Sequence, residues 1–161
     1  MFENIVLASD SDREQIMKLY KEQLGREFCA WNENYPSEET IDFDLSRDAL
    51  FVMKENNEVI AAISIDKDED VEKLDCWDKN LAPGGELSRL AVTHSMQNKG
   101  IARLMMQHGM KALKDRGYKS IHFLVNKYNV PAIQSYAKLG FNDVGECYLY
   151  DQDFLCYEKE L

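Results

Sequence analysis

Leu87-Ser-Arg-Leu-Ala-Val92, with Gln97-Asn-Lys-Gly-Ile-Ala102 shortly after it, is the stretch that decides the fold of this chain. The first six residues predict an apolar strand, and the second six predict a glycine-bearing loop that opens into a helix. Such a loop leaves several backbone N–H groups directed at one point, with the positive end of a helix dipole behind them. Because main-chain donors in this arrangement suit a diphosphate group, we expect a phosphorylated ligand to bind beside the end of this strand.

Two common phosphate motifs are absent from the sequence. A nucleotide P-loop needs lysine directly after its last glycine, whereas Ile101 follows Gly100. The fingerprint of dinucleotide-binding folds, Gly-x-Gly-x-x-Gly, occurs nowhere in the chain. What remains is the spacing Gln97-x-x-Gly100-x-Ala102, in which a side chain at Gly100 would keep a diphosphate away from the backbone amides.

A second block lies further along the chain, where Asn129-Val-Pro-Ala132 leads into Ser135-Tyr-Ala-Lys-Leu-Gly-Phe141. The two blocks together resemble the GNAT superfamily of acyl-CoA N-acyltransferases. In that family Gln/Arg-x-x-Gly-x-Gly/Ala is followed by Asn-x-x-Ala and then by Tyr-x-x-Leu-Gly-Phe. The resemblance covers roughly residues 84–146, and the N-terminal half matches only in outline. Ala102 stands where glycine is frequent, although alanine is also common there.

The resemblance implies a single domain over residues 1–161 with the α/β (α+β) GNAT fold, a mixed, mostly antiparallel central sheet flanked by helices. It further implies an N-acetyltransferase in which a primary amine attacks acetyl-CoA directly. The acceptor would be a small-molecule or peptide amine. Because fold does not fix function, a non-catalytic acyl-CoA sensor or interaction module stays open as an alternative. A structural protein whose glycines only form turns is a third possibility.

The resemblance also implies which residues hold acetyl-CoA. Backbone groups of the strand would pair with the pantetheine arm as an added strand does, and the loop would bind the diphosphate. The strand's apolar side chains can serve the core at the same time, and a lysine in the loop is equally compatible with a solvated surface position. The expected cofactor-binding residues are Leu90, Ala91, Val92, Gln97, Asn98, Lys99, Gly100, Ile101, Ala102, Asn129 and Tyr136.

Glu86, at the start of the central strand, is the candidate general base, because it aligns with the catalytic glutamate of family members that acetylate histone lysines. An amine must lose its proton before it attacks a thioester, and for a lysine-like amine of pKa about 10.4 this costs roughly 4.6 kcal/mol at pH 7. A positioned base contributes on the order of a hundredfold to ten-thousandfold. A glutamate of ordinary pKa needs help from burial or a relaying water. A solvated acid at the strand start is the alternative role for Glu86, and water or His94 are the alternative bases.

Tyr136 falls at the family's tyrosine position and is the candidate general acid for the departing CoA thiolate. Full proton transfer from a phenol of pKa about 10 to a thiolate of about 8.5 is uphill by roughly 2 kcal/mol. A hydrogen bond to the thiolate, or a proton relayed from the amine, is therefore at least as plausible as outright donation. Packing of the ring into the core is the structural alternative.

Composition narrows the class of protein. The chain has 161 residues, 45% of them hydrophobic, which suits one globular domain. Nineteen basic against 29 acidic residues give a net charge of −10, which argues against nucleic acid as a partner. This acidity is compatible with a cationic amine substrate and equally with solubility alone. No apolar run approaches the roughly 20 residues of a membrane span, so we expect no membrane partner.

The cysteines and histidines indicate a cytoplasmic protein without a metal. The four cysteines, Cys29, Cys76, Cys147 and Cys156, are scattered without a Cys-x-x-Cys pair, as expected for free thiols in a reducing cytoplasm. The three histidines, His94, His108 and His122, show no clustered zinc pattern. A homodimer is compatible with the resemblance, but no residue pattern establishes one.

The expected element order is β-α-α-β-β-β-α-β-α-β-β. In chain order the expected elements are a strand at Asn4–Ala8, a helix after Ser9–Asp12 that ends at Gly25, a helix over Ser37–Arg47, a hairpin of Ala49–Lys54 and Val59–Ile65, the strand Glu86–Val92, a helix from Ile101 to Gly117, the strand Ser120–Val125, a helix capped by Asn129 and ended at Gly140, and the strands Phe141–Tyr150 and Phe154–Glu158. Arg26–Pro36 is expected to be irregular, and Asp66–Asn80 a charged connection.

The acceptor site is the least defined part of the prediction. Trp31 and Tyr35, together with carboxylates in the Asp66–Asn80 connection, have the chemistry to hold a cationic amine. A packed tryptophan and a solvated acidic loop are the alternative. We expect Arg89 to pair with an acid on the sheet surface.

Overall fold

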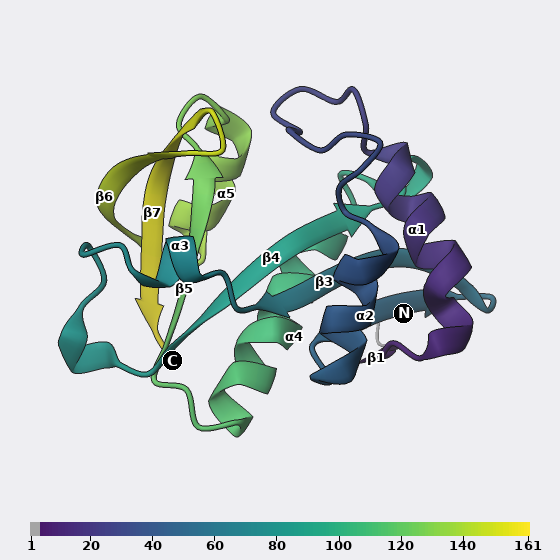
Figure 1. The fold of residues 1–161 in the computed structure, drawn as a ribbon, viewed down its shortest axis with the longest axis horizontal. Coiled ribbons are helices and arrows are strands. Elements are labelled where there is room, and N and C mark those ends of the chain that lie inside the picture. The colour runs from purple at the N-terminus through teal and green to yellow at the C-terminus, as the bar shows by residue number, and fades with distance from the viewer. Residues whose placement is uncertain (1–3) are drawn as a thin grey trace. The chain divides into compact units, whose positions relative to one another are not determined.

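The computed structural model describes residues 4–161, which form two compact units (Figure 1). The first consists of the described residues up to Asp66 and of Leu87–Lys111, and the second of Lys67–Glu86 and Ala112–Leu161. The boundary falls inside one strand, β4 (Gly84–Val92), and inside one helix, α4 (Ile101–Asp115). A single domain over residues 1–161 stays a prediction.

The element order predicted from the sequence is confirmed, with one short helix added. Besides β4, the described strands are β1 (Ile5–Leu7), β2 (Leu50–Glu55), β3 (Glu58–Asp66), β5 (Ser120–Asn126), β6 (Asn142–Leu149) and β7 (Gln152–Glu160). Besides α4, the described α-helices are α1 (Arg13–Glu22), α2 (Glu38–Ser46), α3 (Glu69–Glu72) and α5 (Val130–Lys138). Three-residue 3₁₀ turns are η1 (Asp10–Asp12), η2 (Lys79–Leu81) and η3 (His94–Met96).

The strands of the described residues follow the order β1-β2-β3-β4-β5-β7-β6. The β4–β5 pair is parallel, whereas β1–β2, β2–β3, β5–β7 and β6–β7 are antiparallel. A mixed, mostly antiparallel sheet is therefore confirmed. The β4–β5 ladder joins Gly84–Glu86 with Ser120–His122, and the boundary between the two units follows directly after it.

In the first unit, side chains alternate along β2, so that successive core residues lie on opposite faces of the strand. Leu50 and Val52 belong to a cluster with Ile16, Leu19 and Tyr20 of α1, all of them nearly or fully buried. Phe51 points the other way, and its ring lies 5.0 Å from that of His108 on α4. The first unit is thus a helix–sheet–helix sandwich, and its strands hold the N-terminal part of α4 in place (Figure 1).

In the second unit, an aromatic cluster fixes α5 on the sheet. Phe123 of β5 lies 4.8 Å from the rings of both Tyr136 and Phe141, and 5.9 Å from that of Tyr157. These edge-on contacts supply both buried area and favourable ring electrostatics. They account for the Tyr-x-x-Leu-Gly-Phe spacing, because Tyr136 and Phe141 meet the same phenylalanine.

Besides β7, which extends two residues beyond the predicted strand at each end, two segments differ from the sequence prediction. Part of the connection Asp66–Asn80 forms α3, where Asp68 caps the helix by accepting from the Asp70 N–H and Val71 is buried. The central strand also begins two residues earlier than predicted, at Gly84, because Gly84 and Gly85 join the ladder with β5. A side chain at Gly85 would lie 2.5 Å from Leu113, so close packing explains this glycine.

Candidate functional site

The loop between β4 and α4 has the backbone shape that the sequence predicts. Gly100 has a φ of +81° and Asn98 a φ of +61°, so the chain turns twice through the left-handed region before the helix begins. The first helical hydrogen bond runs from the Leu104 N–H to the Gly100 carbonyl. The N–H groups of Ile101, Ala102 and Arg103 therefore precede the hydrogen-bond ladder of α4, as at any helix N-terminus.

Space around this turn is open. Apart from Gly100 itself and its two chain neighbours, no heavy atom of the described residues lies within 4 Å of the point that a Cβ on Gly100 would occupy. The Ile101 side chain, in contrast, is buried and anchors the first turn of α4. Asn98 and Lys99 are exposed, and the Lys99 ammonium lies 4.0 Å from the sulfur of Met96. The loop therefore combines an anchored helix start with an accessible backbone.

The end of β4 is held through one carbonyl oxygen. The Val92 carbonyl accepts hydrogen bonds from the side-chain amides of Gln23 and Gln97, each at 3.1 Å. A carbonyl oxygen has two lone pairs, so these two donors occupy its capacity. Gln97 was predicted to bind the cofactor. In the structure its side-chain amide bonds the Val92 carbonyl and so holds the loop against the end of the strand.

Two strand residues of the predicted site, Ala91 and Val92, are buried, and Leu90 is half-buried. Ala91 is 2% exposed and packs in the cluster with α1. The buried side chains therefore serve packing, which leaves the backbone as the part of the strand that can bind a ligand. The alternation of the strand is interrupted directly before them by Arg89, whose φ of +51° is unusual for a non-glycine residue in a strand.

Arg89 pairs with acids as the sequence predicts, but the expected place on the sheet surface is wrong, because Arg89 is buried. Its guanidinium donates to both carboxylate oxygens of Asp44, at 2.8 and 2.9 Å, and to Asp66 at 2.9 Å. It also donates to the Tyr35 hydroxyl at 3.1 Å. Burial disfavours the charged guanidinium, but the charges around it, first that of Asp44, raise the pKa of Arg89 above its usual range. Arg89 is therefore permanently charged and fixed.

Glu86, the predicted base, lies in the second unit. It is 6% exposed and occupies the ladder position opposite His122. His122 is itself buried, contacts the Glu72 carboxylate at 3.1 Å and has its ring 4.6 Å from that of Trp77. A carboxyl group in this position is largely shielded from bulk water. Burial of this kind is one of the two forms of help expected for a glutamate base, the other being a relaying water.

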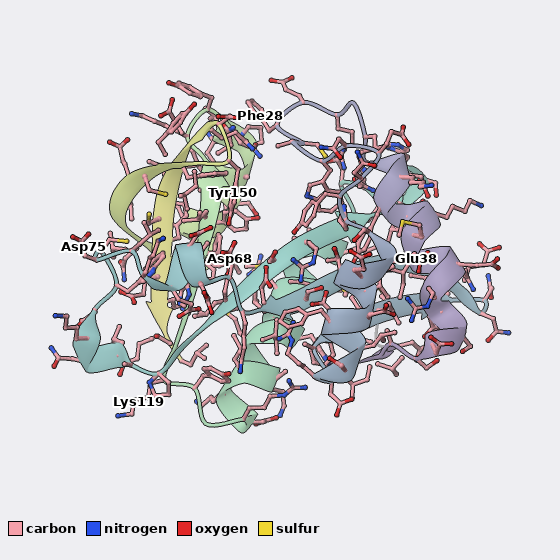
Figure 2. The ribbon with its side chains drawn as sticks, in the orientation of Figure 1. Phe28, Glu38, Asp68, Asp75, Lys119 and Tyr150 are labelled. Carbon is pink, nitrogen blue, oxygen red and sulfur yellow. The ribbon has the colours of Figure 1, made fainter. Side chains whose placement is uncertain are left out.

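Tyr150 belongs to the electrostatic surroundings of Glu86. No sequence pattern singled it out as a site residue. Its hydroxyl donates a hydrogen bond to Asp68, and Figure 2 shows the two residues together. Burial, the bond to Asp68 and the charges of Asp68, Asp70 and Glu86 raise the pKa of Tyr150 above its usual range. Two left-handed residues, Tyr150 and Asp151, form the tight β6–β7 turn that places this hydroxyl.

The two remaining predicted residues are also in the second unit. Asn129 caps α5, with its side-chain oxygen accepting from the Ala132 N–H at 3.3 Å, so its predicted capping role is confirmed. Tyr136 is half-buried in the aromatic cluster, and burial raises the pKa of its phenol. The structure thus brings Leu90–Ala102 together in the first unit, whereas Glu86, Asn129 and Tyr136 belong to the second.

Neither a cluster of metal ligands nor a membrane-spanning helix is found in residues 4–161. No group of three or more His, Cys, Asp and Glu side chains in this part of the chain is arranged to hold a metal ion. Each helix described there is too short or too polar to reach across a bilayer.

Comparisons with known proteins add independent findings. The Acetyltransferase (GNAT) family matches residues 7–141 of the chain. The fold is similar to that of a ribosomal-protein-alanine N-acetyltransferase from Brucella melitensis, with a TM-score of 0.77 and 18% identity over 98% of this chain and 99% of that one. It is also similar to an N-acetyltransferase from Staphylococcus aureus Mu50, with a TM-score of 0.76 and 20% identity over 97% and 96%. The ribosomal-protein-S18-alanine N-acetyltransferase from Escherichia coli gives 0.72 and 19% over 97% and 92%. No curated protein shows a significant sequence match to the chain.

Proposed function

The chain belongs to the acetyltransferase (GNAT) family and is an acetyl-CoA-dependent N-acetyltransferase, and we propose that a primary amine attacks the thioester directly on this protein. Family membership favours the enzyme over the non-catalytic sensor that the sequence left open. The single observation that carries the site assignment is the β4–α4 loop, where a left-handed Gly100 with open space around it precedes the first-turn N–H groups of α4.

The diphosphate of acetyl-CoA is assigned to the backbone N–H groups of the Gln97–Ala102 loop. These donors carry partial positive charge at a helix N-terminus, so an anion is stabilised without a dedicated basic side chain. Lys99 adds a charge at the exposed edge. Gln97 acts mainly by closing the loop on Val92, because its amide donates to that carbonyl.

The pantetheine arm is assigned to the backbone of Leu90–Val92 by strand addition. The Val92 carbonyl already accepts from two side-chain amides, so it is not an acceptor for the arm. We therefore assign the main-chain contacts of the arm to the other backbone groups of this stretch.

Glu86 is assigned as the base that takes the proton of the attacking amine. Its burial supports this role, because a shielded carboxylate holds a proton more readily than one in water. Tyr150 lies in the same electrostatic surroundings, because the Glu86 charge is among the charges that raise the pKa of its hydroxyl. Asp68 and Asp70 add negative charge around Tyr150 and favour a cationic acceptor.

Tyr136 is assigned to the leaving thiolate. Burial raises its pKa above the ordinary value of about 10, so full proton transfer to a thiolate of pKa about 8.5 costs more than roughly 2 kcal/mol. We therefore propose that the phenol donates a hydrogen bond to the thiolate. Glu86 takes one proton of the protonated amine before attack, and the proton of CoA is the second one, which the nitrogen loses after it bonds the acetyl carbon. Asn129, the N-cap of the helix that carries Tyr136, is assigned to cofactor binding in addition to its capping role.

The acceptor is proposed to be the primary amine of a small molecule or a peptide. The charge of −10 supports a cationic acceptor and no nucleic-acid partner. A cytoplasmic location is supported by four cysteines that are all free thiols in the described residues. A homodimer stays a prediction.

The test is release of CoA from acetyl-CoA in the presence of polyamines, aminoglycosides, amino acids and peptides. We expect turnover with at least one amine, a loss of about a hundredfold or more in kcat for Glu86→Gln, and about tenfold for Tyr136→Phe. Tyr157→Phe is the matched control, because Tyr157 is buried in the same aromatic cluster. Wild-type rates in both Glu86→Gln and Tyr136→Phe would remove these assignments.

A further inference from the structure

The C-terminal end of α1 holds the segment that leads into the diphosphate loop. Gln23, the residue after the last helical position, is 4% exposed. Its amide nitrogen donates to the Val92 carbonyl at 3.1 Å and to the Leu19 carbonyl at 3.2 Å, while its oxygen accepts from Arg26 at 2.5 Å. Both amide hydrogens and the amide oxygen are thus engaged, which fixes the side chain in one orientation.

Glu22 makes a second set of contacts with the residues that follow Val92. Its carboxylate accepts from the Thr93 hydroxyl at 2.8 Å and from the His94 N–H at 3.4 Å. The backbone carbonyl of Glu22 accepts from the His94 ring nitrogen Nε2 at 2.8 Å, so that nitrogen carries a proton. One helix end therefore contacts Val92, Thr93 and His94 in succession.

The identity of Glu22 is unexpected for a helix end. A carboxylate in the last turn lies near the negative end of the helix dipole, where lysine or arginine is favoured. Hydrogen bonds from two donors, the Thr93 hydroxyl and the His94 N–H, compensate for this unfavourable position. We therefore attribute the glutamate at this position to its contacts with Thr93 and His94, since it does not stabilise the helix end.

The Val92 carbonyl connects α1 to the loop itself. It receives the Gln23 amide from the helix side and the Gln97 amide from the loop side. A single oxygen atom therefore joins the α1 end to Gln97. Gln97 is three residues before Gly100, whose conformation aims the first-turn N–H groups.

We propose that Glu22 and Gln23 are positioning residues for acetyl-CoA: they hold Val92–His94 so that the Gly100 loop presents its N–H groups to the diphosphate. This inference rests on the proposed binding of the diphosphate by that loop. Neither residue belongs to the sequence motifs that indicated the site.

The test compares two glutamines of the same helix. Gln23→Met keeps the length and removes the amide. Gln15→Met is the matched control, because the Gln15 amide also bonds backbone groups from α1, accepting from the Val59 N–H at 2.8 Å and donating to the Asn57 carbonyl at 3.5 Å. Glu22→Gln, at a half-buried position, is a second variant that tests the same segment with less risk to folding.

We expect Gln23→Met to raise the Kd for CoA and the KM for acetyl-CoA about tenfold, and Glu22→Gln about threefold, with kcat within about twofold. Affinity for pantetheine, which lacks the diphosphate, is expected to change less than about twofold. Gln15→Met is expected to lower the unfolding temperature without changing either affinity.

Unchanged CoA affinity in both Gln23→Met and Glu22→Gln, with the wild type binding CoA, would overturn this inference and leave the proposed function intact. Equal losses for CoA and pantetheine would also overturn it, because the diphosphate would not be the group affected. Failure of the wild type to bind CoA would remove the proposed function, and this inference with it.

Discussion

The middle of β4 and its C-terminal end are a few residues apart, yet they are held by opposite means. Arg89, in the middle, is buried among charged groups, above all the fully buried Asp44. Val92, at the end, is held by two neutral amides and leads into an exposed loop. The middle therefore fixes the strand through strong buried electrostatics, whereas the end keeps its backbone accessible and orients it with weaker, directional bonds. Stability and ligand binding are separated along one strand.

The largest expected effect is at the middle of the strand. Asp44→Asn leaves the buried Arg89 charge without its main partner, and we expect it to cost about 3–5 kcal/mol in the free energy of unfolding. Urea denaturation measures this. Asp42→Asn on the same helix is the control: its carboxylate is 61% exposed in its pair with Arg13, so it should cost less than about 1 kcal/mol. Similar losses in the two variants would show that the buried network does not carry the stability of this region.

A smaller effect is expected at the end of the strand, and in a different property. Gln97→Ala removes one of the two donors to the Val92 carbonyl, worth about 1 kcal/mol, so CoA affinity should fall about fivefold. The free energy of unfolding should change little, because the Gln23 amide still donates to that carbonyl. Titration calorimetry and thermal unfolding measure the two quantities. The exposed Gln107→Ala on α4 is the control. A large stability loss with unchanged affinity in Gln97→Ala would reverse the contrast between the two regions.

The smallest expected effect is the pH dependence of Tyr136. A raised pKa keeps the phenol protonated beyond its ordinary range, so its contribution is present at neutral pH and is lost only as pH rises through the raised pKa. We expect the kcat ratio of wild type to Tyr136→Phe to stay constant from pH 7 to about 9.5. A ratio that falls by pH 9 would contradict the buried, protonated phenol.

The contrast along β4 also explains which features the sequence could predict. The Gly100 turn, the hairpin of Ala49–Lys54 and Val59–Ile65 and the Asn129 cap were predictable, because tight turns and helix caps are local properties of a few residues. The sequence carried the Tyr136-x-x-Leu-Gly-Phe141 spacing as a family motif, but the packing of both rings on Phe123 was not predicted.

Features that depend on distant partners could not be predicted. Arg89 pairs with Asp44 and Asp66, which lie 45 and 23 residues away, and its place in a strand predicted a surface residue. Gln23 showed only helical spacing, yet its amide bonds Val92, 69 residues away. Tyr150 was predicted only as a strand end, and its link to Asp68 spans 82 residues. Each of these contacts exists only once the strands are assembled.

Diphosphate binding by the Gly100 loop is tested most directly by the affinity of CoA for Gly100→Ala compared with Gly117→Ala. Both glycines have positive φ, +81° and +92°, and open space around a Cβ, so each variant pays a similar backbone strain of about 1–2 kcal/mol. If the Gly100 loop binds the diphosphate, calorimetry will show about a tenfold or greater loss of CoA affinity in Gly100→Ala and less than about twofold in Gly117→Ala. Equal affinities in the two folded variants would contradict the assignment of the diphosphate to this loop.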